Sequence, residues 1–240
     1  MESLAAAHEL LRTCLEEGRR EPEDAAAVFA MPIVLNLPKG EAGARLARED
    51  VLADAARAVV MLCLDPRAGQ EGELRDGLAR WYSGRIRKLA RRCRGSAWEA
   101  VQELPGVTCG HARAFVPCAV SRPPRQIAKL QISGTDLPAG REPEPLRASA
   151  PVVAVNGELG MTLGKAAAQV GHASMLLAAH RPLAWVRAWA EQGFPLGVRE
   201  VDGARFAALA TSPGAVPVID AGFTEVAPGS TTVVALQGAG

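Results

Sequence analysis

Residues 151–180 read PVVAVNGELGMTLGKAAAQVGHASMLLAAH, and this stretch decides the fold of the second half of the chain. Val152–Val155 is a short apolar run closed by Asn156-Gly157, a pattern that predicts a buried strand ending in a turn. The residues from Thr162, a type that caps helices, to His180 are small or apolar almost all round. They predict a helix that is buried on most sides and ends shortly before Pro182.

The rest of the second half continues the alternation of helices and strands. We predict helices at 183–191 and 204–210, and strands at 198–201, 216–219 and 231–236. Gly193 ends the first of these helices, and a turn at 227–230 precedes the last strand. Strands that alternate with helices imply an α/β domain with a largely buried sheet.

The first half gives a less regular pattern. We predict helices at 3–17, 49–64 and 83–94, the last one strongly basic, and strands at 32–38, 98–104, 112–116 and 129–132. Residues 138–150 contain three prolines among charged and small residues and are interpreted as a linker. We therefore expect an N-terminal α/β domain at 1–137 and a second domain at 151–240.

The two halves share an order of elements, which has two explanations. The first is a diverged internal duplication, supported by the likeness of Val101–Gly106 to Val198–Gly203 and of Ser133-Gly134 to Ala221-Gly222. The second is an unrelated α/β domain with a common element order. Under a duplication aligned in this way, Ile132 takes the place of Asp220, and only the second half keeps a site.

Composition excludes several classes of protein. The chain is 48% hydrophobic, enough for a sizeable core, yet no apolar run approaches the ~18 residues that a membrane helix needs. The five cysteines form no C-x-x-C pair, which argues against a zinc ribbon and a disulfide scaffold. The first residues lack the order of a signal peptide. We therefore expect a soluble, cytoplasmic protein, with no membrane partner.

Three polar side chains interrupt the apolar helix that follows Asn156. Lys165, Gln169 and His172 are spaced so that they share one face of that helix. Lys165 stands in the first turn, where the helix dipole opposes a cation by roughly 0.3–1 kcal/mol, so an anionic ligand would be needed to favour it. The alternative is a solvated polar stripe with a lysine that extends to the surface.

A second group of polar residues follows the predicted strand at 216–219. Asp220 ends this strand, and Thr224 and Thr232 lie close to it in sequence. Ligands bind at strand carboxyl ends in open α/β sheets, so Asp220 and Lys165 are expected at one edge. There the carboxylate would position a water molecule, and the lysine would face developing negative charge. The alternative is an aspartate that bonds its own turn, with threonines chosen for strand propensity.

The segments Gly160–Ala173 and Asp220–Thr232 together resemble the archaeal- and eukaryotic-type peptidyl-tRNA hydrolases, the second structural class of these enzymes. The resemblance covers roughly residues 151–238. It implies a mixed four-stranded sheet flanked by helices, a homodimer, and hydrolysis of the peptide–tRNA ester without metal or organic cofactor. It also implies roles for six residues, with Lys165, Asp220, Thr224 and Thr232 catalytic and Gln169 and His172 facing the substrate.

Differences from the family pattern leave other functions open. Phe223 stands where the family commonly has a basic residue, and Glu225 where it frequently has glutamine. Phe223 would then line a substrate pocket remodelled around another acceptor, which motivates acyl transfer from aminoacyl-tRNA to a small amine or hydroxylamine. A third interpretation is a non-catalytic module that binds tRNA or protein.

The basic run in the first half is a candidate RNA contact. Between Arg80 and Arg94 there is no acidic residue, and on a helix the cations would meet several phosphates. The candidates are Arg85, Arg87, Lys88, Arg91, Arg92 and Arg94. The partner would be peptidyl- or aminoacyl-tRNA, bound by a homodimer or by a monomer whose halves mimic one. The alternative is a solvated basic face.

Overall fold

The computed structural model describes residues 2–16, 24, 27–132, 137, 145, 149–222 and 225–238. In the second half the elements are β6 (Val152–Asn156), a 3-10 turn (Gly157–Leu159), α7 (Leu163–His180), α8 (Leu183–Glu191), β7 (Gly197–Val201), α9 (Gly203–Ala210), β8 (Val216–Ile219) and β9 (Thr231–Leu236). Every helix and strand predicted for this half is confirmed within one residue at each end. Thr162 caps α7, since its hydroxyl accepts a hydrogen bond from the Lys165 amide.

The second half forms the mixed four-stranded sheet that was expected. Its strand order is β7-β6-β9-β8, with β6 parallel to β7 and the other pairs antiparallel. The helix α7 packs on the face of the sheet that carries Val153 and Val198. Phe206 of α9 packs on the other face, which carries Ala154. The alternation of these strand residues between the two faces explains why both faces are apolar.

In the first half the elements are α1 (Glu2–Arg12), a 3-10 turn (Thr13–Leu15), β1 (Phe29–Asn36), α2 (Gly40–Ala44), α3 (Arg48–Cys63), a 3-10 turn (Pro66–Gly69), α4 (Glu73–Ser83), β2 (Lys88–Cys93), α5 (Ser96–Gln102), β3 (Gly106–Cys109), β4 (Ala112–Phe115), β5 (Cys118–Ala119) and α6 (Arg125–Ala128). The main strand order is β2-β1-β4-β3, and β5 pairs with the start of β1.

Three predictions for the first half are wrong. The basic helix expected at 83–94 is an edge strand, β2, which pairs in parallel with β1. The strand expected at 98–104 is helix α5, because Trp98, Val101 and Leu104 follow a helical period and pack together under it. The strand expected at 129–132 is reduced to a single bridge between Gln131 and Arg92.

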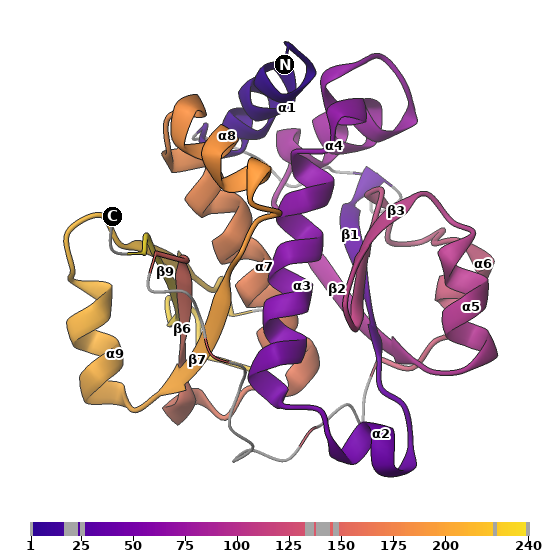
Figure 1. Cartoon of the computed structure of the whole chain (residues 1–240). Helices are drawn as coiled ribbons and strands as arrows, with labels where there is room; N and C mark the ends of the chain where they lie inside the picture. The colour runs from indigo at the N-terminus through magenta and orange to yellow at the C-terminus, as the bar shows by residue number, and fades with distance from the viewer. Residues whose placement is uncertain are drawn as a thin grey trace.

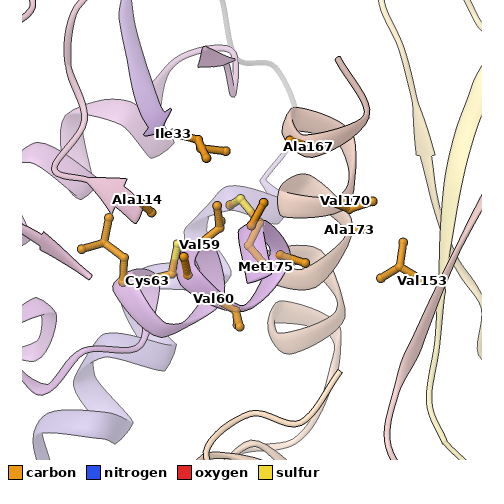
Figure 2. Packing of buried hydrophobic residues seen from close by; sticks show 14 of the residues in the cluster. Ile33, Val59, Val60, Cys63, Ala114, Val153, Ala167, Val170, Ala173 and Met175 are labelled. Carbon is orange, nitrogen blue, oxygen red and sulfur yellow. The ribbon is translucent and has the colours of Figure 1, made fainter. Parts of the chain in front are cut away.

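The helices α3 and α7 lie side by side between the two sheets (Figure 1). Ile33 and Ala114 of the first sheet lie on one side of this pair, and Val153 of the second sheet lies on the other (Figure 2). The contact is close because α7 carries Gly171, where a Cβ would come within 2.9 Å of the Val59 side chain. The predicted domains therefore share one continuous core, and the boundaries at 137 and 151 stay predictions.

The two sheets correspond residue by residue. Here a rung is a row of residues that are paired across all four strands of a sheet. Strand order and strand directions are the same when β2, β1, β4 and β3 are matched to β7, β6, β9 and β8. One rung of the first sheet is Ala90, Ile33, Ala114 and Val107, and the matching rung of the second is Val198, Val153, Ala235 and Val216. Figure 1 shows the outer helices α5 and α9 on the outer faces of their sheets.

The contact between α3 and α7 is also reciprocal. The Ser174 hydroxyl of α7 donates a hydrogen bond of 2.7 Å to the Ala56 carbonyl of α3, while Gly171 of α7 lies against Val59 of α3. When the first residues of the two helices are matched, Ala56 corresponds to Gly171 and Val59 corresponds to Ser174. The contact of Ser174 with Ala56 is then equivalent to the contact of Val59 with Gly171. Such a self-complementary contact is typical of two-fold related units.

Among the helices that the structure describes, none is long and apolar enough to cross a membrane.

Candidate functional site

The candidate site lies where α7 begins and β8 ends. Asp220 follows directly after β8, and Lys165 and Gln169 stand in the first two turns of α7. Thr232 is the second residue of β9, the strand that pairs with both β6 and β8. Residues distant in sequence therefore meet because α7 lies across the sheet beside its last two strands.

Asp220 is the centre of a hydrogen-bonded chain. Its Oδ2 atom accepts hydrogen bonds from the Lys165 ammonium at 2.5 Å and from the Gln169 amide nitrogen at 2.6 Å. The Thr232 hydroxyl donates to the Gln169 carbonyl oxygen at 2.9 Å, which fixes the orientation of that amide. The alternatives of a solvated Lys165 and of a merely local turn bond for Asp220 are therefore wrong.

The ion pair between Lys165 and Asp220 is nearly withdrawn from water. Only 11% of the Lys165 side chain and 9% of the Asp220 side chain are exposed. Burial by itself would raise the pKa of Asp220, but the hydrogen bonds from Lys165, the Gly222 amide and Gln169 outweigh it and hold that pKa below its usual value. The carboxylate is therefore ionised at neutral pH. It can hold a water molecule by accepting a hydrogen bond from the O–H group of that water.

The turn after Asp220 is shaped by Gly222. The Gly222 amide donates to Asp220 Oδ1 at 2.7 Å, and the Gly229 amide donates to the Asp220 carbonyl at 2.8 Å. Gly222 has φ +78°, and a Cβ there would lie 2.4 Å from the Pro228 ring. Phe223 and Thr224, predicted as a pocket residue and a catalytic residue, lie outside the described residues, so their roles stay predictions.

Replacing Gly222 by alanine is expected to lower both stability and activity. Positive φ costs a side chain roughly 1–2 kcal/mol, and the contact with Pro228 adds to that cost by displacing the turn that holds Asp220. Gly229→Ala is the matched control, since Gly229 has φ +80° but open space around it. Thermal unfolding and activity measurements on both variants separate strain from displacement. Equal losses in the two variants would contradict the role given to Pro228.

Glu225 is a functional residue whose role sequence reasoning missed. Its carboxylate accepts hydrogen bonds from both the amide and the hydroxyl of Thr162, at 2.9 and 2.8 Å, and so anchors the Asp220 loop to the start of α7. A carboxylate at this helix end is favoured by the dipole. The cap at Thr162 was recognisable from sequence, but its partner was not, because it follows 63 residues later.

His172 and Lys88, a member of the basic run, were also predicted to contact the substrate. His172 is half-buried on α7, beyond Gln169. Lys88 is directed inward, with its ammonium 3.2 Å from the Met175 sulfur and 4.9 Å from the centre of the Trp81 ring. Burial lowers the pKa of Lys88 to about 7, against an opposing influence of Cys63 and Cys14. The prediction that Lys88 binds RNA is therefore not supported by its position.

Other kinds of site find little support in the described part of the chain. No group of three or more His, Cys, Asp or Glu side chains is placed there to hold a metal ion. Burial raises the pKa of Cys63, Cys93 and Cys109 to about 11, so these thiols are poor nucleophiles at neutral pH. The chemistry offered by the structure is that of a buried carboxylate, an ammonium group and the amide and hydroxyl that orient them.

Comparisons with known proteins point to the same part of the chain. Residues 150–239 match the family described as Peptidyl-tRNA hydrolase PTH2, and this range contains every residue of the Lys165–Asp220 chain. A curated protein from Pyrobaculum aerophilum, named Peptidyl-tRNA hydrolase, is 38% identical over 94 residues, which cover 34% of this chain and 78% of that protein. The match thus spans most of the relative and about a third of the present chain, and we conclude that the chain belongs to the PTH2 family of peptidyl-tRNA hydrolases.

Proposed function

We propose that this protein hydrolyses the ester bond between a peptide and tRNA. The observation that carries the proposal is the nearly buried ion pair of Lys165 and Asp220, held by Gln169 and Thr232, inside the segment that matches the family. Family membership favours water as the acceptor over the amine or hydroxylamine of an acyl transferase. It also favours an enzyme over a non-catalytic binding module.

The proposed reaction uses each of these side chains once. Ionised Asp220 orients a water molecule, whose oxygen attacks the ester carbonyl carbon while its proton moves towards the carboxylate. The Lys165 ammonium stabilises the negative charge that develops on the carbonyl oxygen. The bond from that carbon to the ribose oxygen then breaks, and the ribose oxygen takes up the proton. Gln169 and Thr232 act by positioning Asp220.

The resemblance gives roles to two more residues: Thr224 would help to hold the water, and His172 would contact the peptide or the terminal nucleotide. Phe223, where the sequence departs from the family pattern, would line the substrate pocket. Such an activity is needed where translation takes place, which agrees with the cytoplasmic location predicted from the sequence.

The direct test is the lifetime of N-blocked aminoacyl-tRNA in the presence of the protein. Release of the free blocked amino acid together with intact tRNA is the expected result. The same assay includes small amines and hydroxylamine as acceptors. A covalent acyl-amine product formed in place of the free acid would support transfer instead, and an unchanged ester lifetime would support a binding module.

We also propose that the first half is a diverged copy of the second. The support is the identical strand order, the matched rungs and the reciprocal contact between α3 and α7. The matched rungs correct the alignment expected from sequence, because Val101–Gly106 lies in α5 and the turn after it, whereas Val198–Gly203 lies mostly in β7. The position equivalent to Asp220 then falls in the β3–β4 turn and not at Ile132.

The copy in the first half has no room for the same site. Cys109 and Ala112 match Val218 and Val233, so Gly110 and His111 replace the whole loop of residues 219–232. In this turn Asp54 of α3 accepts a hydrogen bond of 2.7 Å from the His111 amide, whereas Gln169 of α7 donates one to the Asp220 carboxylate. We therefore propose one hydrolytic site per chain, in the second half.

If α3 and α7 take the place of a subunit interface, the protein is expected to be a monomer. Light scattering after size exclusion should give a mass near 25.1 kDa at micromolar concentration. The helix faces that two-fold relatives would use are already covered within the chain, which is the physical reason. A mass of twice this value would contradict the interpretation of the first half as an internal partner.

A further inference from the structure

We propose that strand β2 and helix α6 of the first half form a surface that binds RNA phosphates next to the catalytic site, with Arg92 and Arg94 at its centre. The inference rests on the proposed function, because it identifies where the tRNA part of the substrate would lie. It changes the earlier prediction of a basic helix into a basic edge of a sheet.

Positive charge is concentrated in one segment of the first half. Residues 80–132 contain eleven Lys and Arg and two Glu, a formal charge of +9. Residues 151–240, which hold the hydrolytic site, contain five Lys and Arg and six Asp and Glu, a formal charge of −1. A domain with this balance does not attract a polyanion, whereas the basic segment 80–132 does. The affinity for tRNA must therefore come mainly from outside the catalytic half.

The basic segment lies against the start of the catalytic helix. A Cβ at Gly164 would be 3.8 Å from the Ala90 side chain of β2 and 4.0 Å from the Ile132 carbonyl oxygen. Gly164 precedes Lys165 directly. Arg92, two residues after Ala90 on β2, is half-buried, and Arg94, which follows β2 directly, is exposed.

Within the described residues, Arg92 has no ion pair of the kind that its counterpart makes. Lys88 and Ala90 face α7, and the alternation of strand residues places Arg92 on the same face. The matched residue of β7 is Glu200, whose carboxylate pairs with Arg48, the first residue of α3, at 3.0 Å. At the start of α7 that place is taken by the buried Leu163.

One nitrogen of the Arg92 guanidinium, the buried Nε atom, lacks a hydrogen-bond partner in the described residues. A partly buried cation without an acid favours an external anion, and guanidinium binds phosphate through two parallel hydrogen bonds. Arg113, Arg181 and Arg187 also have a buried Nε without a partner in the part of the chain that the structure describes, and among these arginines Arg92 is the one on the strand that lies against Gly164.

The cations around Arg92 extend the surface. Arg94, Arg125 and Lys129 are exposed. Arg91 donates to the carbonyl of Ala128, the last residue of α6, at 3.4 Å and to the Leu130 carbonyl at 2.9 Å, which connects α6 and the residues after it to β2. The segments 77–98 and 104–132 contain no acidic residue, so no carboxylate within them competes with phosphate.

The experiment compares Arg92→Gln/Arg94→Gln with Arg12→Gln/Arg205→Gln, a control that removes the same charge at exposed positions on α1 and at the start of α9. KM and kcat for N-blocked aminoacyl-tRNA are measured at about 0.05 M and about 0.2 M salt. The surface variant is expected to raise KM at least about tenfold and to reduce the slope of log affinity against log salt by ~1–2. The control is expected to do neither. Arg94→Gln alone, at an exposed position, should give a smaller effect in the same direction.

A short substrate, an N-blocked aminoacyl ester of adenosine, separates RNA binding from chemistry. The loss in the surface variant is expected to fall below about twofold with this ester, because it lacks the phosphates that the salt slope reports. An equal loss with both substrates, or an unchanged KM for tRNA, would overturn the proposal.

Direct binding keeps the test independent of the hydrolysis itself. Fluorescence anisotropy of labelled tRNA should show salt-sensitive binding that weakens in the surface variant, whether or not the ester is cleaved. Binding of polyglutamate or of anionic vesicles with no binding of tRNA would overturn the proposal in favour of an acidic protein or a membrane surface. Failure of hydrolysis with intact tRNA binding would overturn the proposed function alone.

Discussion

Replacing Asp220 by asparagine is expected to lower kcat for N-blocked aminoacyl-tRNA by about 10³-fold, the largest effect of any single substitution considered. The carboxylate is the only anion in the hydrogen-bonded chain of Lys165, Gln169 and Thr232. Asparagine keeps one oxygen for the Lys165 and Gln169 donors but presents an N–H group to the Gly222 amide, which now points a donor at a donor.

The measurement is single-turnover hydrolysis with circular dichroism to verify the fold. Asp202→Asn serves as the control, because Asp202 caps α9 by accepting from the Arg205 amide and asparagine caps helices equally well. The control should retain the wild-type rate. If Asp220→Asn kept its rate within about twofold, the water-positioning role of Asp220 would be wrong.

Replacing Lys165 by methionine is expected to have the second largest effect. Removing one member of a buried ion pair typically costs 3–5 kcal/mol, because the remaining charge stays desolvated. Since burial is the strongest single influence on Asp220, loss of the ammonium should move the pKa of Asp220 above its usual value. We expect kcat to fall about 10²-fold and the acidic limb of the pH–rate profile to move to higher pH.

The sign of the stability change with pH follows from these shifts. In the wild type the pKa of Asp220 is lowered by folding, so its contribution to the free energy of unfolding is present above the unfolded pKa and is lost as pH falls through the folded pKa. In Lys165→Met the pKa is raised, so ionised Asp220 destabilises the fold at neutral pH and protonation relieves it. The difference between the two proteins should therefore shrink from pH 7 to about pH 4.

Denaturant unfolding of wild type, Lys165→Met, Asp220→Asn and the double variant completes a double-mutant cycle. A coupling free energy near zero, or a difference that grows as pH falls, would contradict the buried ion pair as the source of the effect.

The second half was predictable because its signals are local. The run of small and apolar residues between the Thr162 cap and Pro182 determines α7, and the sequence motifs indicate that Lys165 and Asp220 belong to one site. The first half was harder. Lys88–Cys93 is rich in long basic side chains that suit a helix, yet pairing with β1 and burial of Ala90 against α7 make it a strand.

By itself the sequence determined the α/β class, the elements of the catalytic half and the family to which it belongs, since periodicity, caps and motifs act over a few residues. Only the tertiary structure decided that Glu225 anchors α7, that the first sheet matches the second rung by rung and that the buried Arg92 Nε has no hydrogen-bond partner among the described residues. Each of these depends on contacts between residues far apart in the chain. Local sequence preferences do not distinguish between the many possible long-range contacts, so packing of the whole chain selects them.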